Sequence, residues 1–143
     1  MYITLEADYA VRILLYLYEQ GKRCDAKTIS EDTEVTLRFA LKILRKLAAA
    51  GLVQSFKGFK GGYEVACPAN QTTLYDVIQT IEGNCHISRC LDNEVGCNAG
   101  REATCRMRRE FARITKILEQ ELKQVTFQKM LEGECPCAAA ANA

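Results

Sequence analysis

The sequence of 143 residues lacks the features that mark exported proteins and enzymes. The N-terminus MYITLEAD has no basic segment, and the apolar run 13–18 is too short for a signal peptide or a membrane span. No cofactor motif, nucleophile–base pair or substrate-binding signature accompanies the cysteines, which argues against an electron-transfer or redox enzyme. We therefore expect a cytoplasmic protein without enzymatic activity or membrane contact, in a compartment where thiols stay reduced.

One stretch of the chain has no regular pattern of apolar residues that could pack into a core. Residues 85–105 show no apolar alternation and no helical stripe before Ala103, yet they contain four of the eight cysteines, among Gly, Asn and Asp. In a reducing compartment, eight cysteines indicate metal or redox chemistry, or small buried apolar residues, more than a disulfide framework. A loop that cannot pack but carries clustered thiols is expected to be ordered by whatever binds them.

Apolar residues at helical spacing predict two helices with a short polar segment between them. The first helix covers residues 7–20 and ends at Gly21. Asp25 caps the polar segment 25–34, and Thr36 caps the next helix, over residues 37–50. The polar segment 25–34 and the helix 37–50, joined by a tight turn, together predict a helix-turn-helix.

Acidic residues are absent from positions 36–63. Residues 52–56 and 63–66 predict a β-hairpin whose tip is rich in glycine and lysine. The stretch carries six basic residues: Arg38, Lys42, Arg45, Lys46, Lys57 and Lys60. Because the net charge is only +1, this local excess favours a surface that binds double-stranded DNA. A solvated helix face followed by an ordinary turn is the alternative.

The second half of the chain predicts three further helices. Thr73 caps one that ends before Gly83, and residues 126–131 form a short closing helix. Between them, residues 102–124 form a long helix with one apolar stripe of nearly heptad spacing: Met107, Phe111, Ile114, Leu118, Leu122 and Val125. An exposed stripe of this kind predicts a homodimer, which suits a pseudo-palindromic operator. Packing against the same chain is the alternative.

The fold class expected is mainly α with a small β-hairpin wing. Residues 1–83 form a winged helix-turn-helix, 84–105 a cysteine-rich loop, 102–131 the dimerisation and closing helices, and 132–143 a disordered tail. The Cys135-Pro136-Cys137 pair in this tail is interpreted as incidental rather than as a metal site.

Taken together, these features resemble the Rrf-type winged-helix regulators, a family that includes iron–sulfur cluster sensors. The resemblance covers roughly residues 1–131 and rests on DYAVR at 8–12, GLV at 51–53, GGY at 61–63 and three spaced cysteines before the long helix. It implies a homodimeric transcription factor that holds a [2Fe-2S] or [4Fe-4S] cluster in each subunit.

The resemblance assigns the cluster ligands to Cys90, Cys97 and Cys105 by order and place. Six and seven residues separate them, which suits a loop wrapped around a cluster. Zinc knuckles usually pair their ligands about two to four residues apart. Thiolates are the standard ligands of iron–sulfur clusters.

The fourth ligand differs between branches of the family. One branch has a histidine three residues after the last cysteine, where this chain has Arg108, which cannot ligate. In a second branch an acidic residue in the partner's first helix completes the site, and Asp8 occupies that position. Cys85 and His86 are the other candidates. The structural alternative for Asp8 is a first-turn carboxylate that favours the helix dipole.

The same family comparison suggests how DNA is read. We expect the helix from Thr36 to enter the major groove, with Arg38 and Lys42 nearest the base edges. The residues expected at phosphates are Lys27, Thr28, Arg45 and Lys46. The wing is expected to approach the backbone or minor groove through Lys57, Lys60, Gly61 and Gly62.

The function predicted is a homodimeric repressor whose DNA affinity depends on a cluster that senses nitric oxide, iron, oxygen or cluster supply. One alternative is a cluster-free regulator of the same fold that senses thiol oxidation or a metabolite. Arg101, Arg106 and Arg108 could lower the pKa of nearby loop thiols and favour a reversible disulfide. Structural zinc is the other alternative.

Overall fold

The first half of the chain folds into three helices and a hairpin. The protein is described by a computed structural model over residues 3–133. Its helices α1 (Leu5–Gln20), α2 (Ala26–Thr33) and α3 (Leu37–Ala49) precede strands β1 (Val53–Phe56) and β2 (Gly62–Val65). The strands pair antiparallel, with Val53 opposite Val65. An isolated bridge between Cys24 and Tyr63 attaches the segment before α2 to this hairpin.

The second half of the chain contains the remaining helices. It comprises α4 (Leu74–Glu82), the short 3-10 helix η1 (Arg89–Leu91), α5 (Arg106–Gln124) and α6 (Phe127–Glu132). The expected fold class, mainly α with a two-stranded wing, is confirmed. The tail from 134 onwards, with Cys135 and Cys137, lies outside the described residues. None of the helices within residues 3–133 is long and apolar enough to cross a membrane.

Capping residues decide where the helices begin. The Thr4 side chain accepts a hydrogen bond from the Ala7 N–H, so α1 begins at Leu5 and not at the predicted residue 7. Thr73 and Asp76 form a capping box at the start of α4. The long helix begins at 106, later than the predicted 102, because Cys105 is its N-cap and the preceding residues form a turn.

The core lies among α1, α2, α3, α4 and α6. Its largest fully buried apolar side chains are Phe127, Ile13, Leu14, Leu17, Ile29, Ile43, Leu44, Leu47, Val35 and Val77. These positions are the apolar stripes of the amphipathic helices, so the helical spacing of the sequence is what buries them. The Phe127 ring of α6 packs against Tyr18 of α1, with 5.3 Å between ring centroids.

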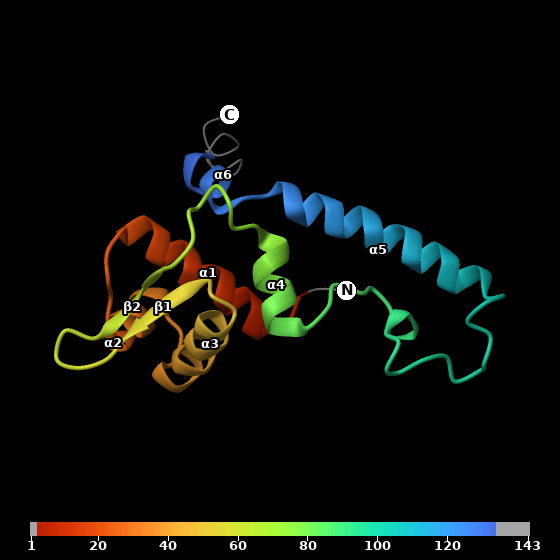
Figure 1. Ribbon diagram of the computed structural model, residues 1–143, viewed down its shortest axis with the longest axis horizontal. Coiled ribbons are helices and arrows are strands. Elements are labelled where there is room, and N and C mark those ends of the chain that lie inside the picture. Colours follow the sequence, from red (N-terminus) through yellow and green to blue (C-terminus); the bar gives the residue numbers. More distant parts are fainter. Residues whose placement is uncertain (1–2, 134–143) are drawn as a thin grey trace, which may run out of the picture.

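Two backbone hydrogen bonds attach the C-terminal end of α5 to the winged helix. The Leu74 N–H donates to the Val125 carbonyl and the Phe127 N–H donates to the Thr72 carbonyl, both at 2.9 Å. The N-terminal end of α5 extends away from this attachment, and the loop 84–105 runs beneath it from the end of α4 (Figure 1). The loop is therefore fixed at both ends and lies outside the main core.

The apolar stripe of α5 is divided between two surroundings. One side packs on α4, where Leu118 and Leu122 are half-buried and Thr115 is buried. Met107 and Ile114 remain 59% and 41% exposed. Packing against the same chain therefore covers only part of the stripe.

We predict that replacing Phe127 with alanine destabilises the protein by about 3–5 kcal/mol, because it empties a fully buried aromatic site. The matched control is Phe59→Ala, which removes a fully exposed ring and should change stability by less than about 0.5 kcal/mol. Urea unfolding of both variants at one protein concentration measures the difference. Equal midpoints for the two variants would contradict the packing of α6.

Candidate functional site

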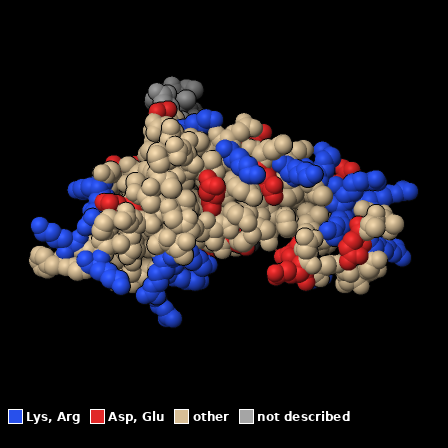
Figure 2. Space-filling model, in the orientation of Figure 1, with Lys and Arg blue, Asp and Glu red and all other residues tan. Residues whose placement is uncertain are grey.

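Helix α3 presents a basic outer face. Arg38, Lys42 and Arg45 are exposed on one side of the helix, while its apolar side packs into the core. Thr36 is the N-cap but makes no side-chain cap hydrogen bond, so its exposed hydroxyl is available to a ligand. Figure 2 shows Lys and Arg side chains gathered over the lower left of the molecule, where α3 and the hairpin lie. This surface has the charge and shape expected of a nucleic-acid interface.

Two of the predicted DNA contacts on α3 pair with one carboxylate on another helix. Lys42 and Lys46 both form ion pairs with Glu6 in the first turn of α1. Arg38 and Arg45 form no ion pair within residues 3–133. Sequence reasoning missed Glu6, because nothing in the spacing of α1 indicates which helix it faces.

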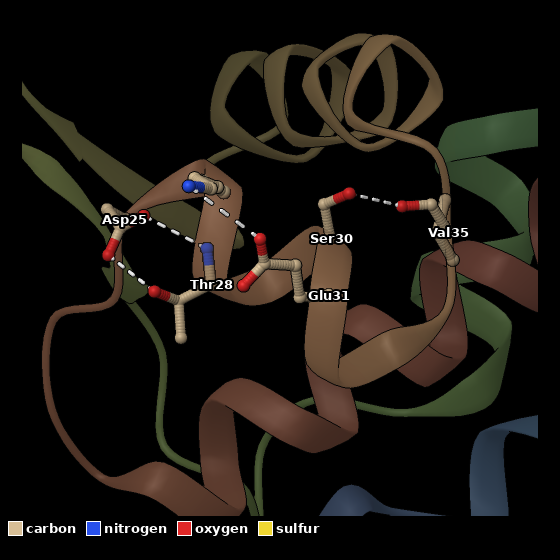
Figure 3. A network of polar contacts seen from close by, with 6 residues as sticks. Asp25, Thr28, Ser30, Glu31 and Val35 are labelled. Atoms are coloured by element: carbon tan, nitrogen blue, oxygen red, sulfur yellow. Dashed lines mark hydrogen bonds and ion pairs between the residues drawn. The ribbon is translucent and has the colours of Figure 1, made fainter.

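The N-terminus of α2 holds the other two predicted phosphate contacts. Asp25 accepts hydrogen bonds from the Thr28 N–H (3.0 Å) and the Thr28 hydroxyl (2.7 Å), as Figure 3 shows. These bonds lower the pKa of Asp25. Lys27 lies 3.9 Å from Glu31 in an exposed pair, which constrains it little. The Ser30 hydroxyl donates to the Val35 carbonyl at 2.6 Å and fixes the turn into α3.

The wing is held from inside by residues that sequence reasoning passed over. The Arg23 guanidinium carbon lies 3.2 Å from the centroid of the Phe56 ring, and the same side chain donates to the Lys60 carbonyl at 3.2 Å. Phe59 is fully exposed at the tip. An arginine just before a helix-turn-helix and an aromatic residue in a basic hairpin were the available signals.

The fold itself explains why glycine occupies two positions of the wing, Gly61 and Gly62. A Cβ at Gly62, where φ is 147°, would lie 2.5 Å from the Cys24 carbonyl oxygen. A Cβ at Gly61 would lie 2.6 Å from the Phe56 carbonyl oxygen. Both positions therefore need glycine to close the hairpin, whether or not they approach DNA. Lys57 and Lys60 are exposed beside them.

Cys90 and Cys105 are linked through Arg108. Cys90 lies in η1, with its Sγ 3.1 Å from the Ser88 Oγ, and its carbonyl accepts a 2.7 Å hydrogen bond from the Arg108 guanidinium. Cys105 Sγ accepts the Arg108 N–H at 3.4 Å, at the N-terminus of α5. The Cys105 side chain therefore acts as the N-cap of this helix.

Cys97 occupies a turn of the same loop. Its N–H donates to a Glu102 carboxylate oxygen at 2.9 Å. The backbone N–H groups of Arg101 and Ala99 lower the pKa of its thiol. Cys90, Cys97 and Cys105 are all free and partly exposed.

The three candidates for a fourth ligand have different surroundings. Cys85 is 8% exposed, and burial, followed by the charges of Glu119 and Glu82, raises the pKa of its thiol. His86 is exposed on the loop. Asp8 is exposed near the start of α1 and pairs with Arg12 at 3.0 Å.

The donor set fits an iron–sulfur cluster by its chemistry. Three free thiols lie on a loop with little packing of its own, and backbone N–H groups lower the pKa of one of them, Cys97. Within residues 3–133, no three His, Cys, Asp or Glu side chains are gathered closely enough to hold a metal ion. A bound cluster would therefore require the loop to draw its thiols together.

A basic helix in a helix-turn-helix, with a basic hairpin beside it, defines a DNA-binding winged-helix protein. The Rrf2 family model, described as "Iron-dependent Transcriptional regulator", matches residues 3–133. The chain thus belongs to the Rrf2 family of DNA-binding transcriptional regulators, which confirms the resemblance seen in the sequence. Its relatives are regulators, in keeping with a role other than catalysis.

Individual relatives support the same assignment. The chain is 33% identical to Protein aau3 of Rhizobium meliloti over 68% of its own length, a match that spans 64% of that protein, less than two thirds. It is 25% identical to the HTH-type transcriptional regulator NsrR of Shouchella clausii, over 94% of this chain and 91% of that protein.

Solved structures share the fold. CymR, the global cysteine regulator of B. subtilis, matches with a TM-score of 0.70 and 22% identity, over 91% of this chain and 95% of that chain. T. potens IscR matches with a TM-score of 0.71 and 19% identity, over 92% of this chain and 87% of that chain.

We predict that Arg38→Ala weakens binding to an operator enriched from random duplexes by about 1–3 kcal/mol, the cost of losing the contact to a base edge that the sequence predicts for Arg38. Binding to a scrambled duplex should change much less. The matched control is Arg113→Ala, an exposed arginine on α5. Fluorescence anisotropy on both duplexes measures the effect, and equal losses on the two would make Arg38 a phosphate contact.

A second prediction concerns the thiols of metal-free protein. The loop thiols of Cys90, Cys97 and Cys105 should be alkylated readily, while Cys24 and Cys85, which are 7% and 8% exposed, should resist until the protein unfolds. Mass spectrometry of peptides after a timed iodoacetamide treatment distinguishes the two groups. Early labelling of Cys85 would contradict its burial.

Proposed function

We propose that the protein is a homodimeric repressor whose affinity for a pseudo-palindromic operator depends on an iron–sulfur cluster. The ligands proposed are Cys90, Cys97 and Cys105 of one subunit and Asp8 of the partner subunit. The supporting observation is the sorting of the cysteines by burial. The three assigned ligands are partly exposed on the loop, whereas Cys85 is buried and its raised pKa disfavours the thiolate that a metal needs.

The exposure of Asp8 favours it over the buried Cys85 for the fourth position. Its side chain is 50% exposed, so it is accessible to a second chain, and its pair with Arg12 is an exposed one that contributes little. A carboxylate is a harder ligand than a thiolate, so such a site would release iron readily.

The exposed part of the α5 stripe supports the homodimer. Met107, Ile114 and Ile117 are 59%, 41% and 47% exposed on a helix whose opposite side already packs on α4. A second copy of the chain would cover these side chains and place two α3 helices in a symmetric pair. The two α3 helices could then read two half-sites about one turn of DNA apart.

This chain's residues provide the connection between sensing and DNA binding. When bound, the cluster would supply a redox-active and nitric-oxide-reactive centre that neutralises the thiolates. Cys105 lies at the start of α5, Cys90 is held to the same helix through Arg108, and Asp8 lies on α1 beside α3. A coupling of about 1–3 kcal/mol between loop order and α3 spacing would change DNA affinity about 5–150-fold.

We predict that Cys97→Ala abolishes bound iron and sulfide in protein purified without oxygen, while leaving a folded dimer. The matched control is Cys67→Ala, which removes a partly buried thiol outside the loop and should keep the iron, the sulfide and the visible absorption. Iron and sulfide assays with absorption spectra measure the outcome. Full iron and sulfide in C97A would overturn the ligand assignment.

The cluster-free thiol sensor is the second candidate, and one observation favours it. The thiol of Cys97 in the loop has a lowered pKa, which favours its oxidation. A protein that stays colourless after anaerobic reconstitution, and that forms a reversible disulfide controlling DNA affinity, would support this candidate over the cluster.

A further inference from the structure

The Glu6 carboxylate forms ion pairs with two lysines from successive turns of α3. The Glu6 Oε2 lies 3.0 Å from the Lys42 Nζ, and the Glu6 Oε1 lies 2.6 Å from the Lys46 Nζ. The two lysines are four residues apart, so they project from neighbouring turns on one side of the helix. The edge-to-face pair of Tyr9 and Phe39, with centroids 5.5 Å apart, packs the same two helices together.

Glu6 is the least exposed member of this group. Its side chain is 18% exposed, against 55% for Lys42 and 38% for Lys46. Burial raises the pKa of Glu6, but the close contacts of Lys46 and Lys42 and their positive charges together bring it below its ordinary value. Glu6 is therefore ionised at neutral pH.

Moving both lysines away from Glu6 would destabilise the folded protein. The Glu6 Oε1 atom is buried and accepts no hydrogen bond of good geometry, so the charge of Lys46 is its compensation. A buried carboxylate without a partner is strongly destabilising. DNA phosphates must therefore compete with Glu6 for these two ammonium groups, whereas Arg38 and Arg45 have no such competitor within residues 3–133.

We propose that Glu6 is a positioning residue for DNA binding, an internal counter-ion that holds Lys42 and Lys46 away from DNA phosphates. It limits how many phosphates each subunit neutralises, and so limits sequence-independent binding. The outer face of α3 then reads DNA mainly through its two arginines. This role depends on DNA binding, which the family establishes, and not on the proposed cluster.

The test is Glu6→Gln in the full chain, compared with wild type at equal iron content. Binding to a scrambled duplex is measured by anisotropy from about 50 to about 200 mM salt. The slope of log K against log salt should steepen by about 0.9 for each lysine that reaches a phosphate. At the low-salt end we expect binding on the order of tenfold tighter, ~1.4 kcal/mol.

The control for net charge is Glu110→Gln. It removes the same charge from the N-terminal part of α5, which extends away from α3 (Figure 1), and there Glu110 forms an exposed ion pair with Arg113. This variant should keep the wild-type slope. Urea midpoints of both variants show whether any change in binding comes with a change in folding.

Lys46→Gln tests the same role independently of how well E6Q folds. If Glu6 already neutralises Lys46, K46Q leaves the wild-type slope unchanged, and E6Q/K46Q loses about half of the steepening gained by E6Q. A flatter slope in K46Q by about 0.9 would mean that Lys46 already binds a phosphate, which overturns the proposal. An unchanged slope in folded E6Q would overturn it as well.

Discussion

The attachment of α5 at one end determines the layout of the molecule. Backbone hydrogen bonds join Leu74 to Val125 and Phe127 to Thr72, and the burial of Phe127 locks them in place. Because α5 is 19 residues long, its other end is carried well beyond the winged helix (Figure 1). The cysteine loop must span that distance from α4, so it lies over little core and stays open to ligands and to a second chain.

Within residues 3–133, solvent exposure distinguishes two buried cysteines from the three loop cysteines assigned as ligands. Cys24 and Cys85 are packed among apolar side chains, where burial raises the pKa of the thiol and keeps it neutral and unreactive. In the loop, Cys105 caps α5, and Cys97 faces backbone N–H groups that lower the pKa of its thiol. The same residue type thus serves as core filler in one part of the chain and as a candidate ligand in another.

The first turns of α1 lie between α3 and the base of the cysteine loop. Glu6 faces α3 and holds two of its lysines, while Asp8, two residues later, points outward and pairs only with Arg12. The Thr4 side chain caps α1 by accepting the Ala7 N–H. The Thr4 N–H donates to the Glu82 carboxylate at the end of α4, where the cysteine loop begins. A displacement of this turn would therefore change the contacts with α3 and with the base of the loop.

The sequence by itself determined the local elements. Helical spacing and caps such as Asp25 and Thr73 located the helices, because these signals act between residues three or four apart. The hairpin followed from two short strands around a glycine-rich tip, and the loop followed from the absence of any apolar pattern. Motifs along the chain were specific enough to indicate the family.

Only the tertiary structure decided which side chains meet. Glu6 and Lys42 are 36 positions apart, and no local pattern pairs them. The burial of Cys85, the late start of α5 at Cys105 and the contact of Gly62 with Cys24 likewise depend on elements distant in sequence. Charge neutralisation, thiol chemistry and the need for glycine are properties of a side chain's surroundings, which only the packing of the whole chain defines.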